Sequence, residues 1–242
     1  CCLFRKSSSY FHVMQFTIGI DIGGTNTRIG IVSSEGKVLG LSKLKTTDYT
    51  DGARYADDIA SATRQLIADF EAKDSSIDYE WLGIGIGAPN GNIYSGCIES
   101  PPNLKMKGDT PIVQLLKDRL DFADIKLTND ANAAAVGEKI FGGAKEFKDF
   151  VMITLGTGLG SGIYVNDQLV YGANGLAGEL GHTTIVPQGR YCGYSRRGSL
   201  ENYCSATGIR RTFFEMISQF GAPTLLDDKK LSEITAKDIS NA

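Results

Sequence analysis

The stretch over residues 129–182 constrains this chain more than any other part of the sequence. It combines a polar turn, a glycine-rich turn directly after an apolar strand pattern, and a Glu-x-x-His pair. In sequence these are Asn129-Asp130-Ala131-Asn132-Ala133, then Gly156-Thr157-Gly158-Leu159-Gly160-Ser161-Gly162, then Glu179-Leu180-Gly181-His182. Glycine turns let backbone N–H groups approach phosphate, and a carboxylate can accept a proton, so the combination favours a catalytic site.

Each of these pieces also has a purely structural interpretation. Asp130 could cap the helix that the pattern predicts over residues 131–141 and complement its dipole. The alternating glycines could form an ordinary hairpin turn after the strand at Phe150–Leu155. Glu179 and His182 could be a surface pair one helical turn apart. Their occurrence together is what favours the functional interpretation.

A second glycine turn lies near the start of the chain. Alternating apolar residues on both sides of it predict a β-hairpin, and a third strand follows over residues 38–45. An aspartate among phosphates makes sense only with Mg²⁺ between them, and a turn aspartate is the alternative. The turn is not a Walker loop, because no Gly-Lys-Ser/Thr ending and no helix follow. The candidate phosphate-binding and Mg²⁺-binding residues are Asp21, Gly23, Gly24, Thr25, Asn26 and Thr27.

The remaining patterns predict a mixed α/β protein. Apolar residues at helical spacing predict a helix over residues 51–72, and further helices are expected over 111–120 and 207–220. Residues 81–87 predict a buried strand. Between strand and helix, an irregular loop with Ser100 and Asn103 carries polar groups suited to binding hydroxyls, although a plain surface loop is the alternative.

Composition excludes several classes of function. The net charge of -3 and the absence of a basic cluster with interleaved aromatic residues argue against a nucleic-acid partner. No apolar run is long enough to span a membrane. The five cysteines form no disulfide framework in 242 residues, which favours a reduced, cytoplasmic setting.

Both ends of the sequence are unusual. Residues 1–13 have too short an apolar run for a signal peptide and are expected to be a non-native or disordered extension before Met14. The last residues, Asp238 to Ala242, stop inside a helical pattern without a stop signal. A truncated chain is therefore expected.

The order and spacing of the motifs resemble the ROK family of bacterial sugar kinases and sugar-responsive repressors. The segments that carry the resemblance are Asp21-Ile22-Gly23-Gly24-Thr25, Asn129 to Ala133, the glycine-rich run after Leu155, and Glu179 to His182. Among the family, the glucokinases are the most similar. The resemblance implies the two-domain actin-like ATPase (ribonuclease H-like) fold, with domains at 14–128 and 129–242, the second of them incomplete.

The resemblance also implies a role for each matched residue. Asp130 corresponds to the general base that takes the proton from the sugar hydroxyl. The sugar-binding positions, Asp130 among them, are Asn103, Asn129, Glu179, His182 and Glu201. The two glycine turns would hold the phosphates of ATP with Mg²⁺, the second one through Gly156, Thr157, Gly158 and Gly160. Domain closure would then exclude water.

The sequence departs from the family at a zinc site. The family usually builds this site from the histidine of Glu-x-x-His and three cysteines. Here Cys192 keeps the first cysteine, whereas Tyr194 and Ser199 replace the others. Two ligands cannot make a tetrahedral structural site, so we expect no structural zinc. Family kinases are also longer, and their extra segment supplies adenine contacts.

The function implied is ATP-dependent phosphorylation of glucose at its 6-hydroxyl. Alternatives are a kinase for fructose, mannose or an N-acetylhexosamine, and a non-catalytic sugar sensor. A DNA-binding repressor is disfavoured because no helix-turn-helix precedes the first strand. The expected partners are a small sugar and ATP, with no nucleic acid and no membrane, and the dimers frequent in the family imply a homodimer.

Overall fold

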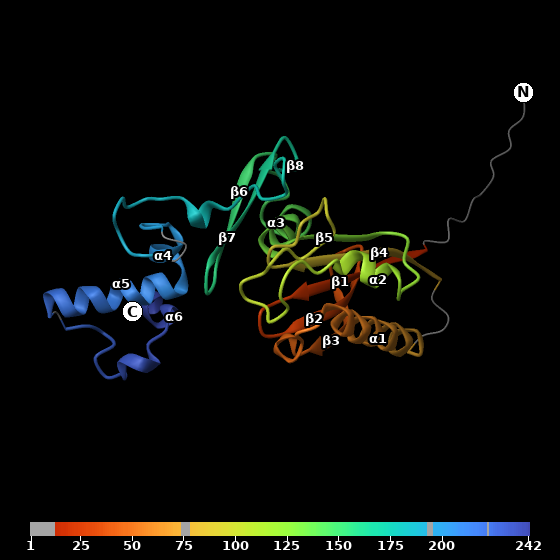
Figure 1. The fold of residues 1–242 in the computed structure, drawn as a ribbon, viewed down its shortest axis with the longest axis horizontal. Helices are drawn as coiled ribbons and strands as arrows, with labels where there is room; N and C mark the ends of the chain where they lie inside the picture. Colours follow the sequence, from red (N-terminus) through yellow and green to blue (C-terminus); the bar gives the residue numbers. More distant parts are fainter. Residues whose placement is uncertain (1–12, 74–77, 193–195, 222) are drawn as a thin grey trace, which may run out of the picture. The chain divides into compact units, whose positions relative to one another are not determined.

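The computed structural model describes residues 13–73, 78–192, 196–221 and 223–242. The expectations for residues 1–12 and for Tyr194 therefore fall outside the described residues. By the contacts among its residues the chain divides into two compact units, Cys1–Thr128 and Asn129–Ala242. Figure 1 draws both units, coloured from red at the N-terminus to blue at the C-terminus.

The first unit is built on a five-stranded sheet with the strand order β3-β2-β1-β4-β5. Strand β1 pairs antiparallel with β2, β2 pairs antiparallel with β3, and β1 pairs parallel with β4. The glycine turn joins β1 to β2, as the alternation in the sequence predicts. The strands are β1 (Met14–Ile22), β2 (Thr27–Ser33), β3 (Val38–Leu44), β4 (Tyr79–Ala88) and β5 (Ile125–Asn129).

One apolar face of this sheet is covered by helices. Every second residue of β1 is buried, from Phe16 to Ile22, because successive side chains of a strand point to opposite faces. Helix α1 (Gly52–Glu71) packs on β2 and β3 and beside α2 (Ile112–Lys117). The side chain of Asp51 starts α1 by accepting a hydrogen bond from the Arg54 N–H at 2.7 Å. A short 3₁₀ turn, η1 (Thr46–Asp48), precedes it.

The second unit begins with a helix packed on a β-hairpin. Its sheet has the order β6-β7-β8, and α3 packs on β6 and β7. Hairpin pairing runs from Phe150↔Tyr164 to Leu155↔Leu159. The elements are α3 (Asp130–Ile140), β6 (Phe150–Leu155), β7 (Leu159–Val165) and β8 (Gln168–Leu169).

The glycine-rich run is therefore not one continuous loop. Only residues 156–158 form the turn, and the rest of the run belongs to β7. A Cβ atom added at Gly160 would lie 2.8 Å from the Cβ of Ala131, and one at Gly162 would lie 2.6 Å from the Cβ of Ala135. These two glycines let β7 approach α3 closely, a packing role that the phosphate-binding expectation for Gly160 does not include.

Short helices complete the second unit. Helix α5 packs against α4 and α6. The Ser205 side chain caps α5 by accepting from the Gly208 N–H at 3.1 Å, and Gly221 ends the helix in the left-handed conformation. The elements are the 3₁₀ turns η2 (Leu180–His182) and η3 (Leu231–Glu233), and the helices α4 (Glu201–Cys204), α5 (Ala206–Phe220) and α6 (Ala236–Asn241).

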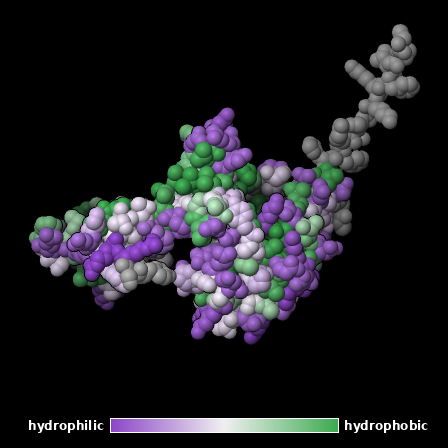
Figure 2. Space-filling view, turned by 45° about the horizontal axis from the view of Figure 1, so that its top comes forward, coloured by the Kyte–Doolittle hydropathy of each residue, from purple (hydrophilic) through white to green (hydrophobic). Residues whose placement is uncertain are grey.

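One side of strand β6 stays exposed. Val151, Ile153 and Leu155 alternate with half-buried residues and are each about half exposed to solvent, at 50%, 47% and 58%. Figure 2 shows hydrophobic surface, in green, over the hairpin that contains them. In the part of the chain that the structure describes, no helix combines the length and apolar character needed to cross a bilayer.

Candidate active site

The first unit brings the N-terminal glycine turn against the loop that carries Asn103. The Gly23 N–H donates to the Asn26 carbonyl at 3.0 Å and closes the turn. A Cβ atom added at Gly24 would lie 3.2 Å from the Asn103 carbonyl oxygen, so only glycine fits at this approach without displacing the loop. A residue expected to bind sugar thus lies beside a turn expected to bind phosphate.

Acidic and hydroxyl groups surround this turn. Asp21 and Thr25 are exposed. The Asp21 carboxylate lies 3.5 Å from Arg28, a solvent-exposed pair that adds little stability. An exposed carboxylate next to a glycine turn has the oxygen donors that Mg²⁺ prefers. Ser100, in contrast, donates its hydroxyl to the Asp109 carboxylate at 3.1 Å.

Thr27 differs from the sequence-based expectation. Its side chain is completely buried, and its hydroxyl lies 2.8 Å from the hydroxyl of Thr46 and in hydrogen-bond contact with that of Tyr55. Burial raises the pKa of Tyr55 to about 12, so its hydroxyl keeps its proton. The Thr27 hydroxyl is therefore part of a buried polar cluster and is not exposed to solvent.

In the second unit, the end of β5 and the start of α3 position Asn129 and Asp130. The Ala131 N–H donates to Oδ1 of Asn129 at 2.9 Å and to Oδ1 of Asp130 at 2.8 Å. The capping interpretation is thus realised, and it fixes the two side chains at the helix N-terminus. The carboxylate of Asp130 remains exposed. Capping and catalysis are compatible because the two oxygens of a carboxylate can serve different donors.

Ser161 on β7 anchors the turn that carries Glu179. Its hydroxyl donates to the Gly178 carbonyl and accepts from the Leu180 N–H at 3.2 Å. In this turn the Glu179 carboxylate lies 3.8 Å from the imidazole Nε2 of His182, and both side chains are about half exposed, at 45% and 53%. The hydrogen bonds to Ser161 therefore hold the turn that carries this pair against β7, and both side chains are partly exposed to solvent.

Glu201 joins the glycine turn to α4. Its carboxylate accepts from the Leu159 N–H at 2.9 Å, and a Cβ atom added at Gly158 would lie 2.6 Å from the same carboxylate. The start of α5 holds the turn from the other side, because the Ala206 N–H donates to the Gly156 carbonyl at 2.9 Å. The second glycine turn is thus held in place by Glu201, a residue predicted to bind the sugar.

Electrostatic interactions connect four of the predicted residues. Partial burial raises the pKa of Glu179, the nearby carboxylates of Asp130 and Glu201 raise it further, and His182 partly offsets the effect. Residues far apart in the sequence therefore share one polar site in the second unit. Three carboxylates and an imidazole can accept and donate several hydrogen bonds to the hydroxyls of a polyol.

Sequence reasoning missed two residues that support this site, Ser161 and Arg190. A polar residue at a buried position of a strand is a usable signal for Ser161. Arg190 gave no signal, because its partners lie far along the chain, on α4 and α5. Its side chain is only 8% exposed.

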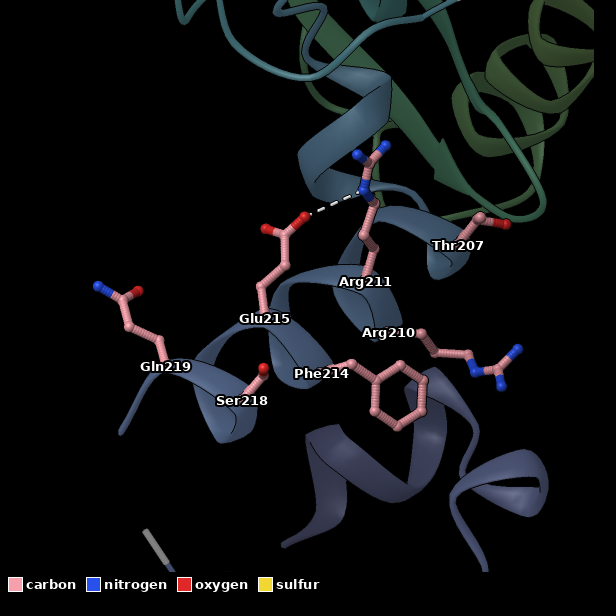
Figure 3. A pocket seen from close by; sticks show the side chains of 7 residues that line it. All are labelled: Thr207, Arg210, Arg211, Phe214, Glu215, Ser218 and Gln219. Carbon is pink, nitrogen blue, oxygen red and sulfur yellow. Dashed lines mark hydrogen bonds and ion pairs between the residues drawn. The ribbon is translucent and has the colours of Figure 1, made fainter. Parts of the chain in front are cut away.

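A groove runs along one side of α5 and adjoins the glycine turn. It begins at Thr207, whose hydroxyl lies 3.4 Å from the Thr157 carbonyl. Figure 3 shows Arg211 reaching Glu215 across this surface. The lining residues are Thr207, Arg210, Arg211, Phe214, Glu215, Ser218 and Gln219.

The sheet, the glycine hairpin and the second α/β unit together define a protein with the actin-like ATPase sugar kinase fold, which confirms the expected fold class. The chain belongs to the ROK family, whose sequence model matches residues 17–242. The predicted family resemblance is thereby confirmed.

Curated relatives in the family include kinases for different sugars. The chain is 34% identical over 231 residues to a glucokinase of Halalkalibacterium halodurans, covering 94% of this chain and 68% of that protein. It is 36% identical over 199 residues to a glucokinase of Streptomyces coelicolor, covering 82% of this chain and 59% of that protein. An N-acetylmannosamine kinase of Yersinia pestis is 30% identical, with 93% and 73% covered.

Solved structures give the same family. A ROK family glucokinase from Streptomyces griseus, in complex with glucose and AMPPNP, has a TM-score of 0.68 and 32% identity, covering 94% of this chain and 70% of that chain. A ROK family transcriptional regulator, a homologue of the E. coli MLC protein, has a TM-score of 0.81 and 25% identity, covering 94% and 55%. This chain thus spans roughly half to three quarters of the length of the relatives it matches.

Proposed function

We propose that this chain belongs to an ATP-dependent hexose kinase that phosphorylates the 6-hydroxyl of glucose. The observation that carries the proposal is the gathering of Asp130, Glu179, His182 and Glu201 in one unit, with Glu201 bonded to the glycine turn. The similarity to glucokinases, and to a structure that holds glucose and AMPPNP, supports the choice of substrate.

In this proposal Asp130 is the general base. Its exposed carboxylate takes the proton of the sugar hydroxyl, the hydroxyl oxygen bonds to the γ-phosphorus, and the bond to the bridging oxygen of ADP breaks. Glu179, His182 and Glu201 hold the other sugar hydroxyls, and Asn129 contributes through its amide nitrogen because its oxygen caps α3. Fixed polar groups orient the sugar, which is how positioning lowers the barrier.

In the same proposal, each unit has a glycine turn that suits phosphate groups. In the second unit the backbone of residues 156–158 lies at the start of α5, where the helix dipole favours an anion. In the first unit the turn at residues 23–26 offers backbone N–H groups, and Asp21 would hold Mg²⁺. When bound, Mg²⁺ neutralises charge on the phosphates. A cytoplasmic setting, in which ATP and Mg²⁺ are abundant, fits this proposal.

The test is ADP release from Mg-ATP across a panel of sugars. The panel contains glucose, fructose, mannose, N-acetylglucosamine and N-acetylmannosamine, and the last one is included because a kinase for it is among the relatives. We expect turnover with glucose to exceed that with the others. Turnover with a different sugar would correct the substrate and keep the class, whereas turnover with none would contradict the kinase proposal for this chain.

A second candidate is a sugar-binding regulator without turnover. The similarity to a solved ROK transcriptional regulator favours it. Calorimetry of glucose binding without ATP separates the two candidates, because a regulator binds the sugar and releases no ADP. The intact Asp130 and the two glycine turns favour the kinase.

A further inference from the structure

The residues at the family's usual zinc position do not fit a metal in this chain. Of the corresponding positions, His182 and Cys192 carry donor side chains, and Ser199 is a buried hydroxyl. Among residues 13–73, 78–192, 196–221 and 223–242, no group of three or more His, Cys, Asp or Glu side chains could hold a metal ion. A tetrahedral structural site needs four such ligands. Another device must therefore hold the loop between His182 and Glu201.

Backbone hydrogen bonds close the base of this loop. The Leu200 N–H donates to the Thr183 carbonyl at 2.9 Å, which joins the residue after His182 to the residue before Glu201. The Ile185 N–H donates to the Gly198 carbonyl at 2.8 Å. The two sides of the loop are thus paired directly beside two predicted sugar ligands.

Arg190 ties the same loop to the helices behind it. Its Nη1 donates to the carbonyl oxygens of Asn202, at 2.8 Å, and Gly208, at 3.3 Å. Its Nη2 donates to the Thr212 hydroxyl at 2.9 Å and to the Glu215 carboxylate at 2.5 Å. A planar guanidinium with several donors suits such a set of fixed acceptors. One buried side chain therefore spans the start of α4 and two turns of α5.

Tyr203 completes the contacts of Arg190. The guanidinium lies 4.4 Å from the centre of the Tyr203 ring, and the Arg190 backbone N–H donates to the Tyr203 hydroxyl at 3.0 Å. The Arg190 carbonyl accepts from the Gly198 N–H at 2.8 Å, so its backbone also joins the two sides of the loop. With only 8% of its side chain exposed, the arginine is bound from all sides.

We propose that Arg190 is the positioning residue that replaces a structural metal in this chain, holding the loop so that His182 and Glu201 face the sugar. Arg190 bonds to the carbonyl of Asn202, the residue after Glu201, and it therefore fixes the end of α4 that presents Glu201. Its effect on sugar binding rests on the proposed function, whereas its effect on the loop does not.

The first experiment measures metal dependence. We expect the purified chain to contain far less than one zinc per molecule by mass spectrometry. We also expect its melting temperature to stay unchanged with 1,10-phenanthroline. One zinc per chain, or a lower melting temperature with the chelator, would overturn the proposal that Arg190 replaces a structural metal.

The second experiment compares Arg190→Lys with Arg211→Lys. Both arginines bond to Glu215, but Arg211 is exposed, lies on α5 with Glu215 and belongs to neither the loop nor α4 (Figure 3). A lysine at position 190 keeps the charge and loses the fork of donors. We expect Arg190→Lys to raise the KM for glucose by about tenfold, with kcat and the KM for ATP within about twofold of the wild type. We expect Arg211→Lys to leave all three values unchanged.

Hydrogen exchange distinguishes failure of this proposal from failure of the proposed function. In Arg190→Lys we expect faster exchange at the amides of Ile185, Gly198 and Leu200, whereas in Arg211→Lys exchange there stays as in the wild type. Unchanged exchange in Arg190→Lys would overturn the bracing role. If the wild type binds no sugar while exchange responds as expected, the proposed function fails and the bracing role stands. Glu215→Gln, which keeps the shape of the acceptor, provides a milder variant should Arg190→Lys fold poorly.

Discussion

The carboxylate of Glu201 accepts a hydrogen bond from the Leu159 N–H at 2.9 Å. The first residue of α4 is thereby joined to the first residue of β7, directly after the glycine turn. A side chain expected to bind sugar thus also determines where the phosphate-type turn lies. Substitution can separate the expected sugar contact of Glu201 from its hydrogen bond to Leu159. The sugar contact is expected to need the charge, whereas the hydrogen bond needs only an acceptor oxygen.

Glu201→Gln and Glu201→Ala should have different kinetic effects. Glutamine keeps an oxygen that can accept from Leu159 and loses the charge, so we expect the KM for sugar to rise about tenfold or more while the KM for ATP changes little. Alanine removes both interactions, and both KM values should rise. Steady-state kinetics with each substrate varied in turn checks this. Equal changes in the two variants would contradict a separate role in the turn.

Asp130→Asn should strongly lower turnover and keep sugar binding. In the wild type, an Asp130 oxygen accepts from the Ala131 N–H at 2.8 Å. Asparagine retains this oxygen, so the start of α3 should be preserved. Loss of the general base should lower kcat by about 10²-fold to 10⁴-fold. Calorimetry gives the sugar affinity, and Asp69→Asn on the exposed side of α1 is the control. Retained turnover in Asp130→Asn would remove Asp130 from the catalytic role.

Glu179 should make the chain less stable as the pH rises. Partial burial raises its pKa above the ordinary value of 4.5, so the folded state holds the proton more tightly than the unfolded state. Any stability from this group is present at low pH and is lost as the pH rises through the raised pKa. We therefore expect Glu179→Gln to gain stability relative to the wild type over that range and then to keep a constant difference.

Glu215→Gln is the control for the pH experiment, because the pKa of Glu215 is shifted in the opposite direction to that of Glu179. Hydrogen bonds from Arg190 and then Arg211 lower the pKa of Glu215. Its contribution is present above its ordinary pKa and is lost as the pH falls through the lowered value. Thermal melting of both variants and the wild type from about pH 2 to about pH 8 measures the two trends. Parallel trends in the two variants would contradict the assignment of Glu179.

Two glycines near α3 should respond oppositely to alanine. A Cβ atom at Gly137 meets nothing within 4 Å, and alanine is the better helix former, so Gly137→Ala should stabilise the chain by roughly 0.5–1 kcal/mol. A Cβ atom at Gly162 would lie 2.6 Å from the Cβ of Ala135, and the crowding should cost roughly 1–3 kcal/mol. Urea denaturation gives both values. A stable Gly162→Ala would show that β7 and α3 are not in close contact.

Local patterns were sufficient for most of the fold. The alternation from Phe16 to Ile22 and the helical spacing over residues 51–72 each depend on a single face being buried, and the structure buries those faces. The positions of Asp130 and Glu179 also followed from their motifs, since each lies at the end of a strand or in a turn whose geometry the neighbouring residues specify.

Other features depend on contacts that no local pattern records. Thr27 looks like a phosphate ligand in its motif, but Thr46 and Tyr55 bury it from a distant turn and helix. Gly160 looks like part of a loop, but its missing side chain makes room for α3. Arg190 has partners on two helices, so its role becomes visible only once the chain is folded.

Strand β7 carries the attachment points of two residues that we propose to bind the sugar. The amide of Leu159 holds Glu201, and two residues later the hydroxyl of Ser161 holds the turn of Glu179. The repeat of the strand, about 3.3 Å per residue, therefore sets the spacing between these attachment points. A shift of β7 along its own axis would therefore move Glu201 and the turn of Glu179 together.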